Sequence, residues 1–127
     1  IGTTLTQAGA TLPKIYCVNW FRKGPDGKFV WPGYGDNMRV LEWMVRRIEG
    51  SAASQANAFG LSPRYEDLRW DGLAFGREQF ASVIGIDPAA WRAELKLHSG
   101  LFEQLAYHLP EALRATQARI EARLTPA

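Results

Sequence analysis

Near the start of the chain, apolar residues form a short continuous run instead of an alternating pattern. Residues 15–18 read Ile-Tyr-Cys-Val, and an unbroken run of this kind is typical of a strand covered on both faces. We therefore predict a strand over residues 14–21. A second, shorter strand is expected over residues 28–31, because Pro25 and Gly27 favour a turn between the two. Together these segments predict an antiparallel hairpin with a basic tip.

The next segment has the spacing of an amphipathic helix over residues 38–49. Asp36 or Asn37 is expected to cap its first turn, because a side-chain oxygen can accept a free backbone N–H. Gly50 is expected to end it. Its apolar residues recur at intervals of one, three and four, which places them on a single stripe of the kind that normally faces a core. The stripe consists of Val40, Leu41, Met44, Val45 and Ile48.

The second half of the chain is expected to be mainly helical. Residues 51–58 are small and polar and indicate a surface loop, whereas a short helix is predicted over residues 77–84. The pair Asp87-Pro88 is a strong helix start, a cap followed by proline at the first helical position. Pro110 breaks that helix and opens another. The predicted fold class is therefore α+β, with short, mostly antiparallel strands followed by a helix-rich C-terminal half.

Composition and charge are those of an ordinary globular segment. Of 127 residues, 46% are hydrophobic and 22% are charged, and 15 Lys and Arg against 13 Asp and Glu give a net charge of +2. This balance indicates neither a nucleic-acid nor a membrane partner, and no run reaches the ~18 apolar residues of a membrane helix. With no visible signal peptide and only one cysteine, the cytoplasm is the expected compartment. That residue, Cys17, has apolar neighbours, so we expect a buried thiol.

Signatures of a complete enzyme are missing from this sequence. It has no G-x-x-x-x-G-K-[ST] phosphate loop, no dinucleotide fingerprint, and no H-E-x-x-H or G-x-S-x-G motif. Its two histidines, His98 and His108, stand ten residues apart, and no carboxylate–histidine cluster is apparent. We therefore expect neither catalytic nor metal-binding residues in this chain. The first residue is Ile1 and not Met, which points to a fragment of a longer protein.

One segment, residues 18–44, combines aromatic and basic side chains with glycines and prolines. Flat side chains on turns suit a flat ligand, and a heterocyclic base stacked between rings gains about 1–3 kcal/mol. Gly33 and Gly35 let the backbone approach a ligand edge. The amide of Asn37 offers a hydrogen-bond donor and an acceptor. Guanine presents an acceptor oxygen beside a ring N–H donor, whereas adenine presents the reverse pattern at those positions. The amide could therefore select guanine, because the wrong base would leave buried polar groups unpaired.

Three interpretations of this segment are open on the residues alone. The aromatic residues could fill a hydrophobic core, while the glycines turn the chain. They could instead line a pocket for a base. Alternatively, the chain could be a free-standing binding module for single-stranded RNA or a proline-rich peptide. Support for the module comes from basic residues that lie near aromatic residues in the sequence, namely Arg22, Lys23 and Lys28 near Trp20 and Phe21. The near-neutral net charge argues against it.

The motifs of this region resemble the C-terminal part of GTP-dependent phosphoenolpyruvate carboxykinase. They read L-P-K-I-Y-C-V-N-W-F-R-K, D-G-K-F-V-W-P-G-Y-G-D-N and R-V-L-E-W-M-V-R-R-I-E-G, and the resemblance is close over residues 12–50. It implies part of the nucleotide-binding domain of a lyase that converts oxaloacetate and GTP to phosphoenolpyruvate, carbon dioxide and GDP in gluconeogenesis. The chain would then be one C-terminal segment. Its expected parts are a flexible lead-in at 1–12, a guanine-binding strand, hairpin and helix at 13–50, and a helical part at 51–127.

The resemblance also implies which residues bind guanine. The family's pocket rings correspond to Trp20, Phe21, Phe29 and Tyr34, its base-reading asparagine to Asn37, and the turn between them to Gly35 and Asp36. This sequence departs from the family in three places. Tyr34 replaces the common phenylalanine, Asp36 replaces glutamate, and Met38 replaces a small polar residue.

The family's phosphate loop and metal ligands precede this region. The resemblance therefore implies that Mn²⁺ and Mg²⁺ belong to the parent enzyme and are held outside this segment. We expect the segment alone to be inactive, because positioning and metal electrostatics supply most of phosphoryl-transfer catalysis. Its expected partners are a guanine nucleotide and the remainder of the enzyme, and the isolated segment is expected to self-associate or to expose apolar surface.

Overall fold

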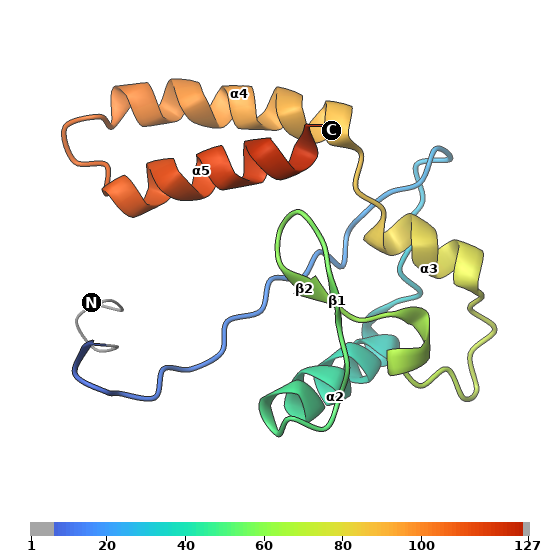
Figure 1. Cartoon of the computed structure of the whole chain (residues 1–127). Helices are drawn as coiled ribbons and strands as arrows, with labels where there is room; N and C mark the ends of the chain where they lie inside the picture. The colour runs from blue at the N-terminus through green and yellow to red at the C-terminus, as the bar shows by residue number, and fades with distance from the viewer. Residues whose placement is uncertain (1–6, 126–127) are drawn as a thin grey trace. The chain divides into compact units, whose positions relative to one another are not determined.

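The computed structural model describes residues 7–125 (Figure 1). These residues belong to two compact units. Unit 1 contains the described residues up to 53 together with 63–83, and unit 2 contains 54–62 and the chain from 84 onward. Helices and a two-stranded antiparallel sheet are both present, which confirms the α+β class. No helix in the described part is long and apolar enough to cross a membrane. The lead-in predicted over residues 1–12 lies partly outside the described residues.

Helix α2 (Asn37–Ile48) begins within one residue of its predicted start and directly follows the short 3-10 helix η1 (Tyr34–Asp36). Gly50 ends it as predicted, with a φ of 78° that favours glycine. The predicted side-chain cap is wrong. Asp36 occupies the N-cap without capping, because its Oδ1 accepts a hydrogen bond from Arg39 Nε at 2.8 Å.

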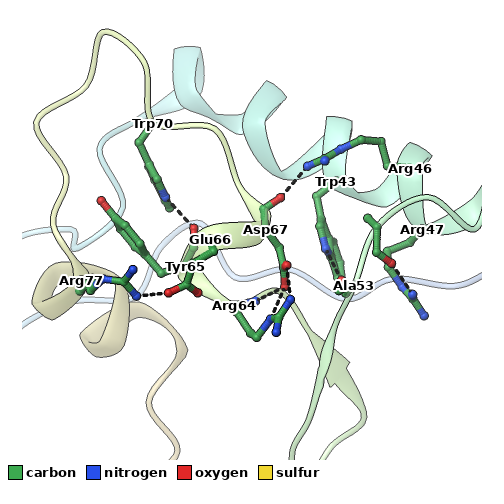
Figure 2. A network of polar contacts seen from close by, with 11 residues as sticks. Trp43, Arg46, Arg47, Ala53, Arg64, Tyr65, Glu66, Asp67, Trp70 and Arg77 are labelled. Atoms are coloured by element: carbon green, nitrogen blue, oxygen red, sulfur yellow. Dashed lines mark hydrogen bonds and ion pairs between the residues drawn. The ribbon is translucent and has the colours of Figure 1, made fainter.

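The buried face of α2 is not the predicted apolar stripe. Trp43, which lies off that stripe, is 2% exposed, whereas the stripe residue Ile48 is 59% exposed. Hydrogen bonds select the covered side (Figure 2): Trp43 Nε1 donates to the carbonyl oxygen of Ala53 at 3.0 Å, and Arg46 Nη2 donates to that of Asp67. Trp and Arg side chains can bury apolar atoms while satisfying a carbonyl. This face therefore docks, while Leu41, Val45 and Ile48 of the stripe remain exposed.

The predicted strand over residues 14–21 is wrong, since no strand is assigned there. Ile15 is 88% exposed, and Cys17 is exposed too, so the expected buried thiol is also wrong. An extended run becomes a strand only where a neighbouring strand satisfies its N–H and C=O groups, and no described segment pairs with this one. Of the predicted hairpin, the described residues form one antiparallel bridge, between Lys23 and Phe29.

An aromatic cluster forms the core of unit 1. The ring of Trp70 stacks on Tyr65, with centroids 5.1 Å apart, and on Phe75, with centroids 5.2 Å apart. Phe80, from helix α3 (Arg77–Ile84), meets Trp70 edge-on at 5.7 Å. Trp31 completes the cluster and is 5% exposed. Rings of this size dominate the apolar area that a small unit can bury, and α3 spans the residues predicted for it.

A polar network surrounds the 3-10 helix η2 (Tyr65–Asp67) on the rim of this cluster (Figure 2). Arg64 Nη2 lies 2.9 Å from Asp67 Oδ1, and Arg77 pairs with Glu66. The hydrogen bond from Arg64 lowers the pKa of Asp67, and the one from Arg77 lowers the pKa of Glu66. The same Asp67 bond raises the pKa of Arg64. These shifts are explained by ion pairing within the network.

The helices of unit 2 begin where the sequence predicts. Helix α4 (Pro88–Gln104) has an N-cap in which Asp87 Oδ1 accepts hydrogen bonds from the backbone of Ala89 and Ala90. Helix α5 (Glu111–Leu124) follows Pro110. Figure 1 shows the two helices side by side, and each contributes one buried residue, Leu95 from α4 and Leu124 from α5.

The strands of the structure lie outside the predicted hairpin. Strand β1 (Gln55–Ala56) pairs antiparallel with β2 (Leu61–Ser62). The surface loop predicted over residues 51–58 is therefore wrong at β1. Asn57 stabilises the turn between the strands, because its Oδ1 accepts from the backbone N–H of Phe59 and of Gly60.

Candidate functional site

A pocket of about 410 Å³ opens in unit 1 beside the start of α2. Three consecutive parts of the chain supply its lining: the extended segment before the turn, η1, and the first two turns of α2. Both polar and apolar side chains contribute, and one glycine exposes its backbone. The lining residues are Tyr16, Val18, Trp20, Tyr34, Gly35, Asn37, Met38, Leu41 and Met44.

The chain reaches this pocket through a turn that depends on glycine. Gly33 has a φ of 146°, a conformation that residues with a Cβ rarely adopt. The turn leads directly into η1 and α2. Arg39 then holds the start of the helix, because its guanidinium donates to Asp36 and to the carbonyl oxygens of Arg69 and Asp71. The pocket wall formed by η1 is thus tied to the rest of unit 1.

Two of the three aromatic side chains that line the pocket, Tyr34 and Trp20, differ in exposure. Tyr34 is 92% exposed, so its ring is left free of packing. Trp20 is half-buried, and it packs at a tilt on Trp31 with ring centroids 5.7 Å apart. A solvent-exposed ring and an anchored ring in the lining of one pocket are suited to hold a flat apolar face. Gly35 lies between Tyr34 and Asn37 in the sequence, and a Cβ at this position would meet nothing within 4 Å.

The carboxamide of Asn37 has a fixed partner on the side of the core. Its Oδ1 accepts a hydrogen bond from Trp31 Nε1 at 2.8 Å. Asn37 also lines the pocket, whereas Trp31 does not. The amide therefore connects the buried aromatic cluster to the pocket.

The structure brings only part of the predicted set together. Trp20, Tyr34, Gly35 and Asn37 line the pocket, while Phe21, Phe29 and Asp36 do not. The rings of Phe21 and Phe29 instead meet each other edge-on at 5.8 Å, and both are exposed. Lys23 Nζ lies 5.7 Å from the Phe29 ring centroid. The carboxylate of Asp36 is used by Arg39.

Sequence reasoning missed several residues of this pocket. Leu41 and Met44 belong to the stripe expected to face a core, and they line the pocket instead. Tyr16 belongs to the segment predicted as a strand. It lines the pocket instead, and its hydroxyl donates to the carbonyl oxygen of Met44 at 3.4 Å. The helical spacing that places Leu41 and Met44 on one face with Asn37 and Met38 was the available signal.

A larger hollow, of about 600 Å³, lies in unit 2 at the β1–β2 turn. Its lining consists mainly of small residues, together with Leu61 and one cation, Arg123. Arg123 Nη1 donates to the carbonyl oxygen of Ala58 at 3.3 Å. The hollow contains no aromatic ring and none of the predicted site residues. Its chemistry therefore offers less for recognition than the smaller pocket, in spite of its size.

Within the part of the chain that the structure describes, no three His, Cys, Asp or Glu side chains gather closely enough to hold a metal ion. The groups with shifted pKa values, Arg64, Glu66 and Asp67, belong to the ion-paired network and do not line the pocket. The pocket therefore presents rings, an amide and apolar side chains, which are groups that bind and orient a ligand.

Residues 2–123 match the protein family described as phosphoenolpyruvate carboxykinase C-terminal P-loop domain. Three curated relatives are named phosphoenolpyruvate carboxykinase (GTP). The relative from Anaeromyxobacter sp. (strain K) is 46% identical over 101 residues, 80% of this chain and 17% of the relative. The relative from Renibacterium salmoninarum is 40% identical over 113 residues, which are 89% of this chain and 19% of the relative. The relative from Treponema pallidum (strain Nichols) is 39% identical over 121 residues, which are 94% of this chain and 20% of the relative. The chain thus spans about a fifth of the length of these curated relatives.

Proposed function

Because this chain belongs to the C-terminal P-loop domain family of GTP-dependent phosphoenolpyruvate carboxykinases, we propose that its pocket beside α2 binds the guanine base of GTP and GDP. In this proposal, Trp20 and Tyr34 contact the faces of the base, and Gly35 lets the base edge approach the backbone. Asn37 reads the edge by hydrogen bonding. The chain serves as the base-binding part of an enzyme that forms phosphoenolpyruvate, carbon dioxide and GDP from oxaloacetate and GTP.

The observation that carries the proposal is that Trp20, Tyr34, Gly35 and the amide of Asn37 line one pocket. Stacking on exposed aromatic rings contributes about 1–3 kcal/mol per base, but it does not distinguish purines. The amide supplies the missing discrimination, because a buried polar group left unpaired by the wrong base costs binding energy. The family resemblance implies that Phe21 and Phe29 also stack on the base. With both rings exposed at the turn, we propose that they contribute to the pocket only when the rest of the enzyme is present.

The remaining chemistry of the reaction is proposed to lie elsewhere in the enzyme. Phosphoryl transfer needs cations on the phosphates and metal ions that bridge them, and we assign these, with the Mn²⁺ and Mg²⁺ ligands, to residues outside this segment. The segment alone is then inactive and binds guanine nucleotides weakly, because it anchors only the base. We also propose that the enzyme works in the cytoplasm.

Nucleotide preference in a full-length carboxykinase that contains this segment tests the proposal. Asn37→Ala should lower kcat/KM for GTP and ITP while leaving kcat/KM for ATP nearly unchanged. Asn57→Ala, in the turn between β1 and β2, provides a control in which an asparagine is lost outside the pocket. If the preference for GTP over ATP survives Asn37→Ala intact, the role assigned to Asn37 is wrong.

A further inference from the structure

The hydrogen bond between Trp31 and Asn37 determines which way the Asn37 carboxamide is turned. An indole N–H can only donate, so the atom 2.8 Å from Trp31 Nε1 must be the amide oxygen. Turning the amide over would place two N–H donors against each other. The Nδ2 group, with its two N–H donors, is consequently directed away from the indole.

Trp31 itself is held firmly in place. It is 5% exposed, and its ring packs against Trp20 at 5.7 Å, Phe75 at 6.0 Å and Trp70 at 6.5 Å between centroids. A buried N–H that loses its acceptor carries the full cost of its lost hydration. Rotation of the Asn37 amide is therefore opposed by the desolvated indole as well as by the loss of one hydrogen bond.

We propose that Trp31 is a positioning residue that fixes the selectivity of the pocket for 6-oxopurines. This inference rests on the function proposed above. With Oδ1 held by Trp31, Asn37 offers its Nδ2 donors to the ligand. A 6-oxo group, as in guanine or hypoxanthine, accepts from such a donor. The 6-amino group of adenine presents a donor to a donor and leaves both unpaired. Trp31 thus enforces the choice between the two purine classes without contacting the base.

Trp31→Phe in the full-length carboxykinase keeps a ring in the cluster and removes only the indole N–H donor and its bicyclic extension. The preference for GTP and for ITP over ATP, measured as a ratio of kcat/KM values, should fall about fivefold, the effect of one neutral hydrogen bond. Trp70→Phe is the matched control. It removes an indole N–H from the same cluster, where the bond goes to the carbonyl oxygen of Tyr65, and it should leave the ratio unchanged. An unchanged ratio in Trp31→Phe, or an equal fall in Trp70→Phe, overturns the proposal.

A double-mutant cycle separates this inference from the function on which it rests. If Trp31 acts through Asn37, adding Trp31→Phe to Asn37→Ala should change the GTP/ATP ratio no further, and an additive loss overturns the inference. If Asn37→Ala alone leaves the ratio unchanged, the proposed function fails first.

A second variant applies even if Trp31→Phe does not fold. Asn37→Asp keeps an acceptor for Trp31 Nε1 but has no donor for a 6-oxo group when ionised. It should reduce kcat/KM for GTP about tenfold or more and reduce that for ATP less. Equal losses for both nucleotides would overturn the inferred selectivity of the Nδ2 donors.

Discussion

The carboxylate of Asp67 receives the guanidinium of Arg64 in a bidentate pair, with Nη2–Oδ1 at 2.9 Å and Nε–Oδ2 at 3.1 Å. The backbone N–H of Arg64 donates to the same carboxylate at 2.8 Å. The Asp67 side chain is only 7% exposed, and its carbonyl oxygen accepts from Arg46 of α2. Asp67 therefore stabilises the end of η2 and connects this short helix to α2, which forms one wall of the pocket.

Protonating Asp67 should destabilise unit 1. The pKa of Asp67 is lowered in the folded state. Its charge therefore contributes fully to the free energy of unfolding above the pKa of the unfolded state, about 3.9. That contribution is lost as the pH falls through the folded pKa. Asp67→Asn should lower the free energy of unfolding by about 1 kcal/mol near pH 7, since Arg64 is half exposed and solvent screens the pair. The difference from wild type should shrink toward acidic pH. Denaturant titrations from pH 7 to 3 measure this.

Asp71→Asn provides a matched control for that series, because it removes the same charge from an exposed position in unit 1. It should change stability by much less. Equal effects of the two substitutions at every pH would show that general charge balance, and not the Arg64 pair, accounts for the loss.

Gly35 and Gly33 should respond in opposite ways to alanine. A Cβ at Gly35 meets no protein atom within 4 Å, and its φ is not positive, so Gly35→Ala should leave the thermal midpoint nearly unchanged. It should weaken GTP binding about tenfold in the full-length enzyme, because the methyl group occupies pocket space meant for the base. Gly33→Ala should instead cost about 1–3 kcal/mol of stability at its φ of 146°.

Thermal unfolding and nucleotide titration of both variants make the test. Unaltered GTP affinity in a folded Gly35→Ala enzyme would mean that the base does not approach this edge of the pocket.

The exposed apolar residues on the stripe of α2 should make the isolated chain self-associate. Val45 and Ile48 are both more than half exposed, and contiguous apolar surface of this kind is normally covered in a stable monomer. Val45→Lys should lower the average mass seen by light scattering, whereas Glu49→Gln, which changes the charge equally at an exposed polar site, should not. A monodisperse, monomeric wild-type chain would contradict this prediction.

The thiol of Cys17 should react in the native chain. It is exposed on a segment without regular structure, so an aromatic disulfide reagent should modify it within about tenfold of the rate in denaturant. Reaction that begins only on unfolding would mean that residues 14–21 are covered, as their apolar pattern first predicted.

Local signals in the sequence predicted the helices well. The Asp87 cap, the proline that follows it and Pro110 set the starts of α4 and α5 through contacts within a few residues, and Gly50 ends α2 through its own φ. The strand over residues 14–21 failed for the opposite reason. A strand needs a partner at a distance, and apolar content alone does not supply one.

The buried side of α2 was a failure of another kind. Apolar spacing predicted the stripe, but Trp43 and Arg46 dock because carbonyl acceptors from residues 53 and 67 meet them. Such acceptors belong to the backbone and have no sequence signature. The same limit applies to the site. Turn glycines and the family resemblance predicted Trp20, Tyr34, Gly35 and Asn37, yet the bond between Asn37 and Trp31 follows only from the folded geometry.

A crystal structure of the full-length carboxykinase with GDP would test the central claim most directly. We predict that the guanine contacts the rings of Trp20 and Tyr34, with its O6 about 2.7–3.2 Å from Asn37 Nδ2. Asn37 Oδ1 should remain bonded to Trp31 Nε1. A base bound away from these residues, or a pocket filled by protein side chains from the rest of the enzyme, would contradict the account.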